Sequence, residues 1–381
     1  MSNQNQNQNQ SLTHQYINVI STNLPAFGSY VFIDLNVPNF CIHEVVLQIA
    51  LSSVSGISGG SAALALPSLA PAYKFIQNIT ITNNNNILDV IDGTANHLMN
   101  QLYTSLEDAL FINTAAGPYN NALVRYNMSL VPNTYQVVLK SFFPQCRPEI
   151  LNSNSAIRIA ILLETLTNIV NQGALVGTPI VTINSISALC KVTKYSNELV
   201  NSKLAQLSRN PLLKTYNTLV YQPYVIQANQ SMCTIPLSNF VGQQIQAVYF
   251  VIRPSVNINR AESFINQQVI NYNVLGPTSE SICGGLITGV QGLYIYGRTM
   301  TLGNFLCDST YGNVYSWYHT SDIISTLTQS AQVYGSRTYN GSESLVLNFA
   351  LSNVPLNVDI YASVTSVYKQ NPNASIIKLI V

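Results

Sequence analysis

Histidine, cysteine and carboxylate side chains are the groups in this chain that could bind a metal ion or carry out catalysis. The histidines are His14, His43, His97 and His319, and the cysteines are Cys41, Cys146, Cys190, Cys233, Cys283 and Cys307. A cupin-type metal site needs clustered histidines, but these four show no ligand spacing. The cysteines include no CxxC pair, so we interpret them as reduced, buried apolar residues rather than as disulfides. The sequence therefore predicts no metal site.

Motifs for nucleophilic or phosphate chemistry are also missing from the sequence, which has no GxSxG nucleophile elbow. The Gly-rich stretch from Ser55 to Leu66 lacks the Gly-Lys-Ser/Thr ending of a phosphate loop, so a surface loop is expected there. Glu107 and Asp108 are adjacent and would point in different directions on a helix, which favours a solvated helix end over an acid–base pair. We predict no catalytic residue, no cofactor and no enzyme activity. A site assembled from distant strands is the alternative.

The composition indicates a surface that other protein copies cover. Hydrophobic residues make up 47% of the chain, charged residues make up 8%, and the formal net charge is +1. Ordinary soluble domains carry about 25% charged residues, and their charge keeps free molecules apart. A bias in the coding DNA would enrich asparagine in the same way. Lysine and arginine are too few to displace counterions from phosphates, so we expect no nucleic-acid binding.

The N-terminal segment alternates strictly between asparagine and glutamine. The alternating residues are Asn3, Gln4, Asn5, Gln6, Asn7, Gln8, Asn9 and Gln10. They cannot bury apolar surface, so we predict a flexible arm over residues 1–15, which either orders against neighbouring molecules or is an inert tail. The segment lacks the basic and apolar stretches of a signal peptide, and no run in the chain approaches about 18 apolar residues. We therefore expect a protein made in the cytoplasm without a membrane span.

Short β-rich runs separated by turns dominate the rest of the chain. In the first half the predicted strands are Tyr16–Ile20, Tyr30–Leu35, Val45–Leu51, Phe75–Thr82, Ala122–Leu130, Tyr135–Phe142, Ala156–Glu164 and a region over Ile180–Tyr195. In the second half they are Leu219–Gln227, Met232–Leu237, Ile245–Arg253, Gln268–Val274, Leu293–Thr299, Ala331–Ser336, Leu345–Leu351, Val358–Val367 and Ser375–Ile380. Helical patterns are expected around His97–Tyr103, Glu198–Ser208 and Val314–His319. Because Pro211 ends the second of these helices, we divide the chain into domains 16–210 and 211–381.

The two halves repeat one another in order. The segment that starts at Tyr30, YVFIDLNVPNFCIHEVVLQIAL, matches the segment that starts at Met232, MCTIPLSNFVGQQIQAVYFVIRP. The later matches are Ile79 with Leu293, Leu123 with Leu345, and Ala156 with Ala374. A repeat of roughly 170 residues is too long for an immunoglobulin-like sandwich of about 100 residues and fits a jelly roll. The predicted fold class is all-β, with two tandem eight-stranded jelly-roll β-sandwiches and short helical insertions.

Two similar sandwiches in one chain resemble the double jelly-roll major capsid proteins of the adenovirus and tectivirus lineage, and the length is closest to the compact bacteriophage members. The resemblance covers residues 16–381 and is carried by segments such as FIQNITITNNNNILDVI and SLVLNFALSNVPLNVDIYASVTSVYKQ. It implies a homotrimeric, pseudo-hexagonal capsomer of an icosahedral virion made in the host cytoplasm. The implied partners are neighbouring capsomers, minor capsid or penton proteins and, often, an internal lipid membrane. It also implies that the loops Ser52–Pro71 and Gly276–Gly289 are tower or inter-capsomer elements and that the arm lies on the inner face.

A viral spike or a lectin-like carbohydrate-binding protein built on the same sandwich is the alternative function. Tyrosine-rich runs, YQPY at Tyr221–Tyr224 and GLYIYG at 292–297, could form a glycan-binding surface. Aromatic residues are more often used at subunit contacts and core edges. A monomer that binds sugars and forms no lattice would favour the alternative.

Overall fold

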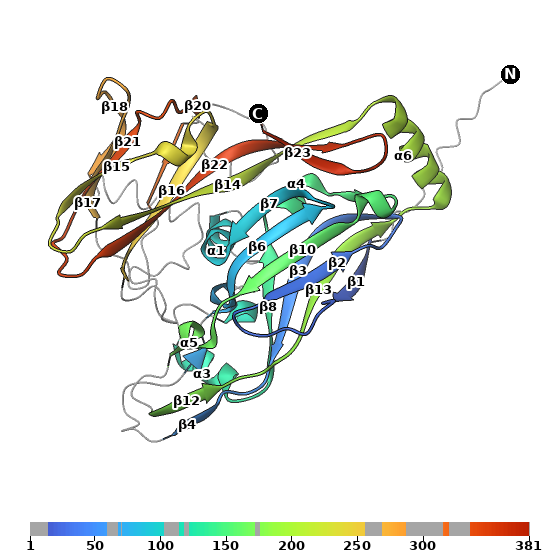
Figure 1. Ribbon diagram of the computed structural model, residues 1–381, viewed down its shortest axis with the longest axis horizontal. Helices are drawn as coiled ribbons and strands as arrows, with labels where there is room; N and C mark the ends of the chain where they lie inside the picture. Colours follow the sequence, from blue (N-terminus) through green and yellow to red (C-terminus); the bar gives the residue numbers. More distant parts are fainter. Residues whose placement is uncertain are drawn as a thin grey trace.

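The computed structural model describes residues 14–58, 68–69, 71–102, 114–117, 122–171, 176–255, 269–286, 315–319 and 336–380 (Figure 1). These residues form mostly antiparallel β-sheet, so the predicted all-β class is confirmed. The predicted strand Leu293–Thr299, nearly all of Ala331–Ser336 and the Glu107–Asp108 pair lie outside the described residues. Within the described part of the chain, no helix has the length and apolar character needed to cross a membrane.

The first half of the chain forms a sandwich of two antiparallel sheets. Its large sheet has the strand order β1-β13-β3-β8, and β9 adds to β3. The bounds are β1 His14–Ile20, β13 Ile183–Lys194, β3 Phe40–Leu51, β8 Asn133–Leu139 and β9 Glu149–Ile150. Its small sheet has the order β2-β10-β6-β7. The bounds are β2 Tyr30–Leu35, β10 Ile157–Leu163, β6 Ile76–Asn83 and β7 Asn86–Asp92.

The core of the first half lies between these sheets because apolar side chains alternate along the strands. Val45, Leu47 and Ile49 of β3 are at most 1% exposed, and Ile79 and Ile81 of β6 are fully buried. All five belong to one cluster of buried apolar side chains. Burying one such side chain contributes about 1.5–3 kcal/mol, so the alternation itself drives the two sheets together.

The second half of the chain forms another sandwich. Its large sheet has the order β14-β22-β16-β19, with β20 on β16 and β23 on β22. The bounds are β14 Leu212–Ile226, β22 Leu356–Gln370, β16 Gln244–Pro254, β19 Tyr315–Tyr318, β20 Arg337–Thr338 and β23 Ile376–Ile380. Its small sheet has the order β15-β21-β17-β18. The bounds are β15 Met232–Pro236, β21 Ser344–Phe349, β17 Val269–Leu275 and β18 Ser281–Leu286.

The two sandwiches have the same strand order. The eight strands, in chain order, are β1, β2, β3, β6, β7, β8, β10 and β13 in the first half, and β14, β15, β16, β17, β18, β19, β21 and β22 in the second. In each half the first, eighth, third and sixth strands form the large sheet, and the second, seventh, fourth and fifth form the small one. Two packed four-stranded antiparallel sheets of this kind are a jelly roll. The predicted pair of tandem jelly rolls is confirmed.

A β-bulge stands at the same place in the third strand of each half. His43 is the extra residue of β3 opposite β13, and Gln246 is the extra residue of β16 opposite β22. The bulged side chain reaches the eighth strand in both halves: His43 Nε2 lies 2.7 Å from Thr193 Oγ1, and Gln246 Nε2 donates to Thr365 Oγ1 at 2.9 Å. The repeat therefore extends to single hydrogen bonds.

The match of Tyr30 with Met232 is confirmed, because these residues open β2 and β15, the second strands of the two jelly rolls. The match of Leu123 with Leu345 is wrong. Leu345 lies in β21, a seventh strand, whereas Leu123 lies in helix α3 (Ala122–Ser129). Both segments are short apolar runs before a Val-Pro turn, so their local sequences do not distinguish the helix from the strand.

The remaining two matches are also wrong. Ala156 immediately precedes the seventh strand β10, whereas Ala374 lies in the turn between β22 and β23, after the eighth strand of its half. Ile79 lies in the fourth strand β6, and the fourth position of the second half is occupied by β17. Leu293 lies outside the described residues. The pairing partners of each strand, rather than its local sequence, decide these positions.

Four local predictions also need correction. The predicted strand Ala122–Leu130 is helix α3, whose buried Arg125 and Ser129 follow helical spacing. The predicted helix Val314–His319 contains strand β19, which pairs with β16. The expected loop Gly276–Gly289 contains β18, and β1 begins at His14, inside the range assigned to the arm. Long-range pairing overrides local pattern in the second and third cases.

Short insertions decorate the first jelly roll. Two small ribbons pair β4 (Ser55–Ser58) with β12 (Val176–Ile180) and β5 (Ser68–Leu69) with β11 (Val170–Asn171), so part of the expected loop Ser52–Pro71 is strand. The helical insertions are η1 Ala72–Phe75, α1 Gly93–Leu102, α3, α4 Phe142–Cys146, η2 Ser153–Ser155 and α5 Leu166–Ile169, and η3 Ser238–Phe240 lies in the second half. Helix α1 contains most of the predicted helical pattern at His97–Tyr103.

Helix α6 (Asn197–Arg209) joins the two jelly rolls, as the sequence predicts for Glu198–Ser208. Ser196 caps its start, because its side chain accepts a hydrogen bond from the Leu199 backbone N–H at 3.2 Å. The helix ends at Arg209 and the backbone becomes extended at Asn210. Its apolar face covers a small separate core, whose members are Cys41, Leu151, Tyr195, Val200, Leu207 and Ala374. The linker therefore packs on both halves of the chain.

Candidate functional site

The outer face of the second large sheet is the main contact between the two jelly rolls. Along β16, Val248 and Phe250 belong to the second core, while the alternating Ala247 and Tyr249 belong to the first. Tyr361 of β22, which pairs with Tyr249, also joins the first core. The other members from the second half are Tyr216, Tyr368 and Ile376. Along most of β16 and β22 both faces are therefore buried, one within the second sandwich and the other against the first jelly roll.

Strand β7 of the first jelly roll receives the polar groups of this sheet. Tyr361 Oη donates to Asp92 Oδ2 at 3.1 Å, and Thr218 Oγ1 donates to Asp89 Oδ1 at 2.6 Å. Tyr216 Oη donates to the Leu88 carbonyl. Burial raises the pKa of both Asp89 and Asp92, more than their hydrogen bonds lower it. These directional hydrogen bonds fix the position of β7 relative to β14 and β22.

The outer edge of β14 is covered by the first jelly roll rather than left free. Gln145 of α4 donates from Nε2 to the Asn217 carbonyl at 3.1 Å, and its Oε1 accepts from the Asn217 N–H at 2.8 Å. The side-chain amide thus imitates a neighbouring strand. Lys214 Nζ donates to the Cys146 carbonyl at 2.8 Å. Such covers prevent a long edge strand from pairing with other chains.

The β22–β23 hairpin reaches over the first jelly roll beside α6 (Figure 1). Gln370 Nε2 donates to the Glu149 carbonyl at 3.0 Å, and the Ile376 N–H donates to Asn83 Oδ1 at 2.8 Å. Asn154 Nδ2 donates to the carbonyl of Asn373 at the turn of the hairpin, at 3.1 Å. The second jelly roll therefore holds the first at the hairpin, at β7 and at α4, which opposes rotation between them.

Buried charges lie at the margin of this contact. Arg253 of β16 and Asp359 of β22 form an ion pair in which both side chains are nearly buried, and Tyr221 Oη donates to Asp359 at 2.8 Å. Burial, together with the charge of Arg253, lowers the pKa of Lys74 in η1 to about 7. Buried charges of this kind contribute more to a unique geometry than to net stability.

A groove of about 460 Å³ runs between β7 and β14 along the same contact. Its walls include Ile87 and Val90 from the first jelly roll and Tyr221 and Tyr361 from the second. A neighbouring hollow of about 260 Å³ shares Ile87 and Lys378 with it, and burial lowers the pKa of Lys378. The lining is mainly apolar and comes from both jelly rolls, so the groove belongs to the domain contact.

Two of the histidines meet in space although the sequence separates them. The rings of His14 and His43 lie 4.9 Å apart edge to face, and both contact the Thr193 hydroxyl. Burial, followed by the nearby His14, lowers the pKa of His43. The register of β1, β13 and β3 brings them together, and no signal in the sequence alone gives that register. Among the described residues, no three histidine, cysteine or acidic side chains gather into a metal-binding group.

Four cysteines are free thiols, and the side chain of Cys283 in β18 lies outside the described part of the structure. Cys41, Cys146 and Cys190 are buried and Cys233 is partly buried, and burial raises the pKa of each thiol. Their interpretation as reduced, mainly buried residues is confirmed for these four. Cys307 and the arm residues Asn3–Gln10 lie outside the described residues.

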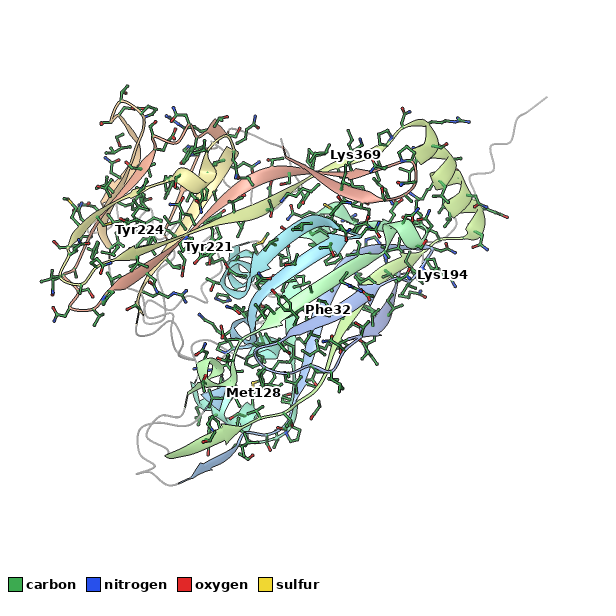
Figure 2. All side chains as sticks on the ribbon, viewed as in Figure 1. Phe32, Met128, Lys194, Tyr221, Tyr224 and Lys369 are labelled. Atoms are coloured by element: carbon green, nitrogen blue, oxygen red, sulfur yellow. The ribbon has the colours of Figure 1, made fainter. Side chains whose placement is uncertain are left out.

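The tyrosine run at Tyr221–Tyr224 combines packing contacts with exposed surface, because Tyr221 is 40% exposed and Tyr224 is partly buried. Both tyrosines lie along β14 (Figure 2). The Tyr221 ring stacks on Tyr361 at 5.1 Å, and Tyr224 packs against the second core. Because the Tyr221 hydroxyl already donates to Asp359, it has limited capacity to donate to a bound sugar.

These features define a double jelly-roll protein whose two domains are joined by a buried sheet face. Similar solved structures cover nearly the whole chain. VP54 of PBCV-1 has a TM-score of 0.64 at 12% identity, over 94% of this chain and 95% of that one. The Faustovirus major capsid protein has a TM-score of 0.63 at 10% identity, over 93% and 90%. The mavirus major capsid protein has a TM-score of 0.57 at 7% identity, over 96% and 90%.

At sequence identities of 7–12%, the comparison shows that this chain and the matched proteins share a fold. The matched proteins are double jelly-roll major capsid proteins, so the recognition made from the sequence is confirmed at the level of fold. No family model and no curated protein sequence matches the chain.

Replacement of Gln145 by leucine tests the cover on the β14 edge. Gln145→Leu removes three hydrogen bonds, one to the Ser141 carbonyl and two to Asn217, and leaves the buried N–H and carbonyl of Asn217 without the side-chain partner. We expect the free energy of unfolding to fall by about 1–3 kcal/mol in urea titrations. The matched control Gln206→Leu, on the exposed side of α6, should change it by less than about 0.5 kcal/mol. Equal losses in the free energy of unfolding for the two variants would contradict the role of Gln145 as a cover of the β14 edge.

Acid should destabilise the protein through His97 of α1. Burial, followed by the charge of Lys74, lowers the pKa of His97 to about 3. Below about pH 6.5 the unfolded chain binds a proton that the folded chain does not, so this stability is fully present above pH 6.5 and is lost as pH falls toward 3. The free energy of unfolding should therefore fall by up to about 1.4 kcal/mol for each pH unit between these two values. Unfolding titrations at several pH values in this range should show a weaker pH dependence of the free energy of unfolding for His97→Gln than for the wild-type protein. An unchanged pH dependence would refute the role of His97.

Proposed function

We propose that this chain is the major capsid protein of an icosahedral virus and that three copies form a pseudo-hexagonal capsomer. The observation that carries this proposal is the presence of two jelly rolls in one chain, fixed to each other through a buried sheet face. A trimer of such chains sets six similar domains in a ring, so a threefold assembly imitates sixfold symmetry. The fold shared with the PBCV-1, Faustovirus and mavirus proteins supports the same role.

The domain division and the arm are parts of this proposal. Residues 16–210 and 211–381 form the two capsomer domains, and the division is supported by the end of α6 at Arg209 and the start of β14 at Leu212. The Asn-Gln alternation of residues 3–10 is an assembly arm toward neighbouring capsomers. Support for the arm comes from its composition, which offers many hydrogen-bonding amides and no apolar surface of its own.

The trimer is held by apolar and hydrogen-bonded contacts, since the chain has only 8% charged residues. Ion pairs among exposed side chains weaken as salt screens them, whereas apolar burial does not. Neighbouring capsomers and minor capsid or penton proteins are the further partners, and the virion shell is the location.

Sedimentation and electron microscopy of the purified protein test the proposal. We expect pseudo-hexagonal trimers whose population stays the same between about 0.05 M and 1 M salt. Dissociation of the trimer by moderate salt alone would contradict the apolar contact. Single monomers that bind a glycan array would instead support the lectin-like alternative.

A further inference from the structure

A β-bulge in β7 places two apolar side chains on the same outer face of this strand. The register of β7 against β6 shifts between Ile87 and Asp89, so Leu88 is the extra residue. Leu88 and Asp89 are therefore both buried, and the next outward position falls on Val90. Ile87 is 56% exposed and Val90 is 44% exposed. The bulge thus gives β7 an apolar outer row where simple alternation would separate these two residues.

This apolar row is one wall of the groove of about 460 Å³ between the two jelly rolls. The opposite wall belongs to β14 and includes Leu219, Val220 and Tyr221. Along β7 the groove extends over the stretch from Ile87 to Asp92, a length of about 16 Å at the usual rise of a strand. Ligand sites commonly have volumes of about 300–1,000 Å³ and often lie between domains. The groove therefore has the size and the position of a site for one elongated apolar molecule.

Two charged side chains line the groove, and they differ in how the protein satisfies them. The Asp92 carboxylate accepts hydrogen bonds from the Ala95 N–H at 2.7 Å and from Tyr361 Oη at 3.1 Å. Lys378 of β23 also lines the neighbouring hollow of about 260 Å³ together with Ile87, which places the lysine at the other end of the β7 stretch. The negative end of the groove is thus satisfied by the protein itself.

Lys378 has neither a hydrogen bond nor an ion pair within the part of the chain that the structure describes. Its Nζ lies 5.8 Å from the centroid of the buried Tyr216 ring. The charge of Asp89 acts on Lys378, but that carboxylate is fully buried, accepts from Thr218 and forms no ion pair with the lysine. Burial lowers the pKa of Lys378, and a bound anion would oppose this effect. The positive end of the groove therefore suits an anionic group.

Polar residues surround this end of the groove. The smaller hollow beside Lys378 is lined by Gln243, Gln244 and Thr365 among others. Thr365 Oγ1 accepts a hydrogen bond from Gln246, which leaves its own O–H available to donate. A long apolar space that ends at a lysine and at hydrogen-bonding side chains complements an amphiphile with one charged end.

We propose that the groove between β7 and β14 binds a single-chain fatty acid. Lys378 binds the carboxylate, and the hydrocarbon chain lies along Ile87 and Val90 opposite Tyr221. The lysine favours an acid over a neutral or cationic lipid of the same length, and the single narrow groove favours one chain over two. A sugar would lose hydrogen bonds to water against such mainly apolar walls. This inference does not depend on the proposed function.

Calorimetric titration of the purified protein with dodecanoate, below the concentration at which it forms micelles, tests the site. We expect one dodecanoate to bind per chain. Lys378→Met keeps the length of the side chain and removes its charge, so it should weaken dodecanoate binding about 10- to 100-fold and leave binding of dodecanol unchanged. The control is Lys369→Met in β22 (Figure 2), which should bind dodecanoate like the wild-type protein. Lys369 points to the opposite face of the hairpin, because its neighbour Tyr368 is the residue that pairs with Lys378.

A second variant tests the groove without changing a charge. Val90→Trp, at a half-exposed position, fills the space between β7 and β14 and should abolish binding of both dodecanoate and dodecanol, with an unchanged circular dichroism spectrum. Undiminished binding by Val90→Trp would show an adventitious site elsewhere and overturn the proposal. Equal weakening by Lys378→Met and Lys369→Met would show general attraction to positive charge and also overturn it. A wild-type protein that binds no dodecanoate, as expected if a segment of this chain or a second copy occupies the groove, would overturn it as well.

Discussion

Strands β16 and β22 of the second large sheet bury both of their faces along most of their length, and the arrangement of the two jelly rolls depends on this burial. A sheet that closes one sandwich normally leaves its other face to solvent and alternates apolar with polar residues. In β16 and β22 nearly every residue is buried, because one set fills the second core and the alternate set enters the first. The first jelly roll covers that second set in the orientation that the structure shows.

Polar groups make that orientation unique. Apolar burial alone would tolerate sliding of one jelly roll on the other, since it depends on area rather than direction. The bonds from Tyr361 and Thr218 to the two aspartates of β7 are directional, and their loss would leave buried oxygens unpaired. Gln145 and the β22–β23 hairpin add hydrogen bonds at two further places. Together these hydrogen bonds oppose sliding and rotation of one jelly roll on the other.

The two halves share one strand plan but differ in the residues on the outer faces of their large sheets. The same bulge and the same bond to a threonine occur in both third strands, which shows that the two halves share one detailed plan. Their outer faces nevertheless diverge, with Tyr249 and Tyr361 in one half and Val46 and Leu189 in the other. The two tyrosines are buried against the first jelly roll, whereas Val46 and Leu189 are only partly buried.

The sequence by itself determined the features that depend on neighbouring residues. Alternation along the chain predicted most strands, the segment before Pro211 predicted α6, and the match of Tyr30 with Met232 located the second strand of both jelly rolls. The low charge indicated a protein that acts through its surfaces. The tertiary structure alone decided which strand pairs with which, that Ala122–Leu130 is a helix, and that His14 meets His43. Every strand has the same period of two, so the pattern that reveals a strand carries no information about its partner, which the packing of distant residues selects.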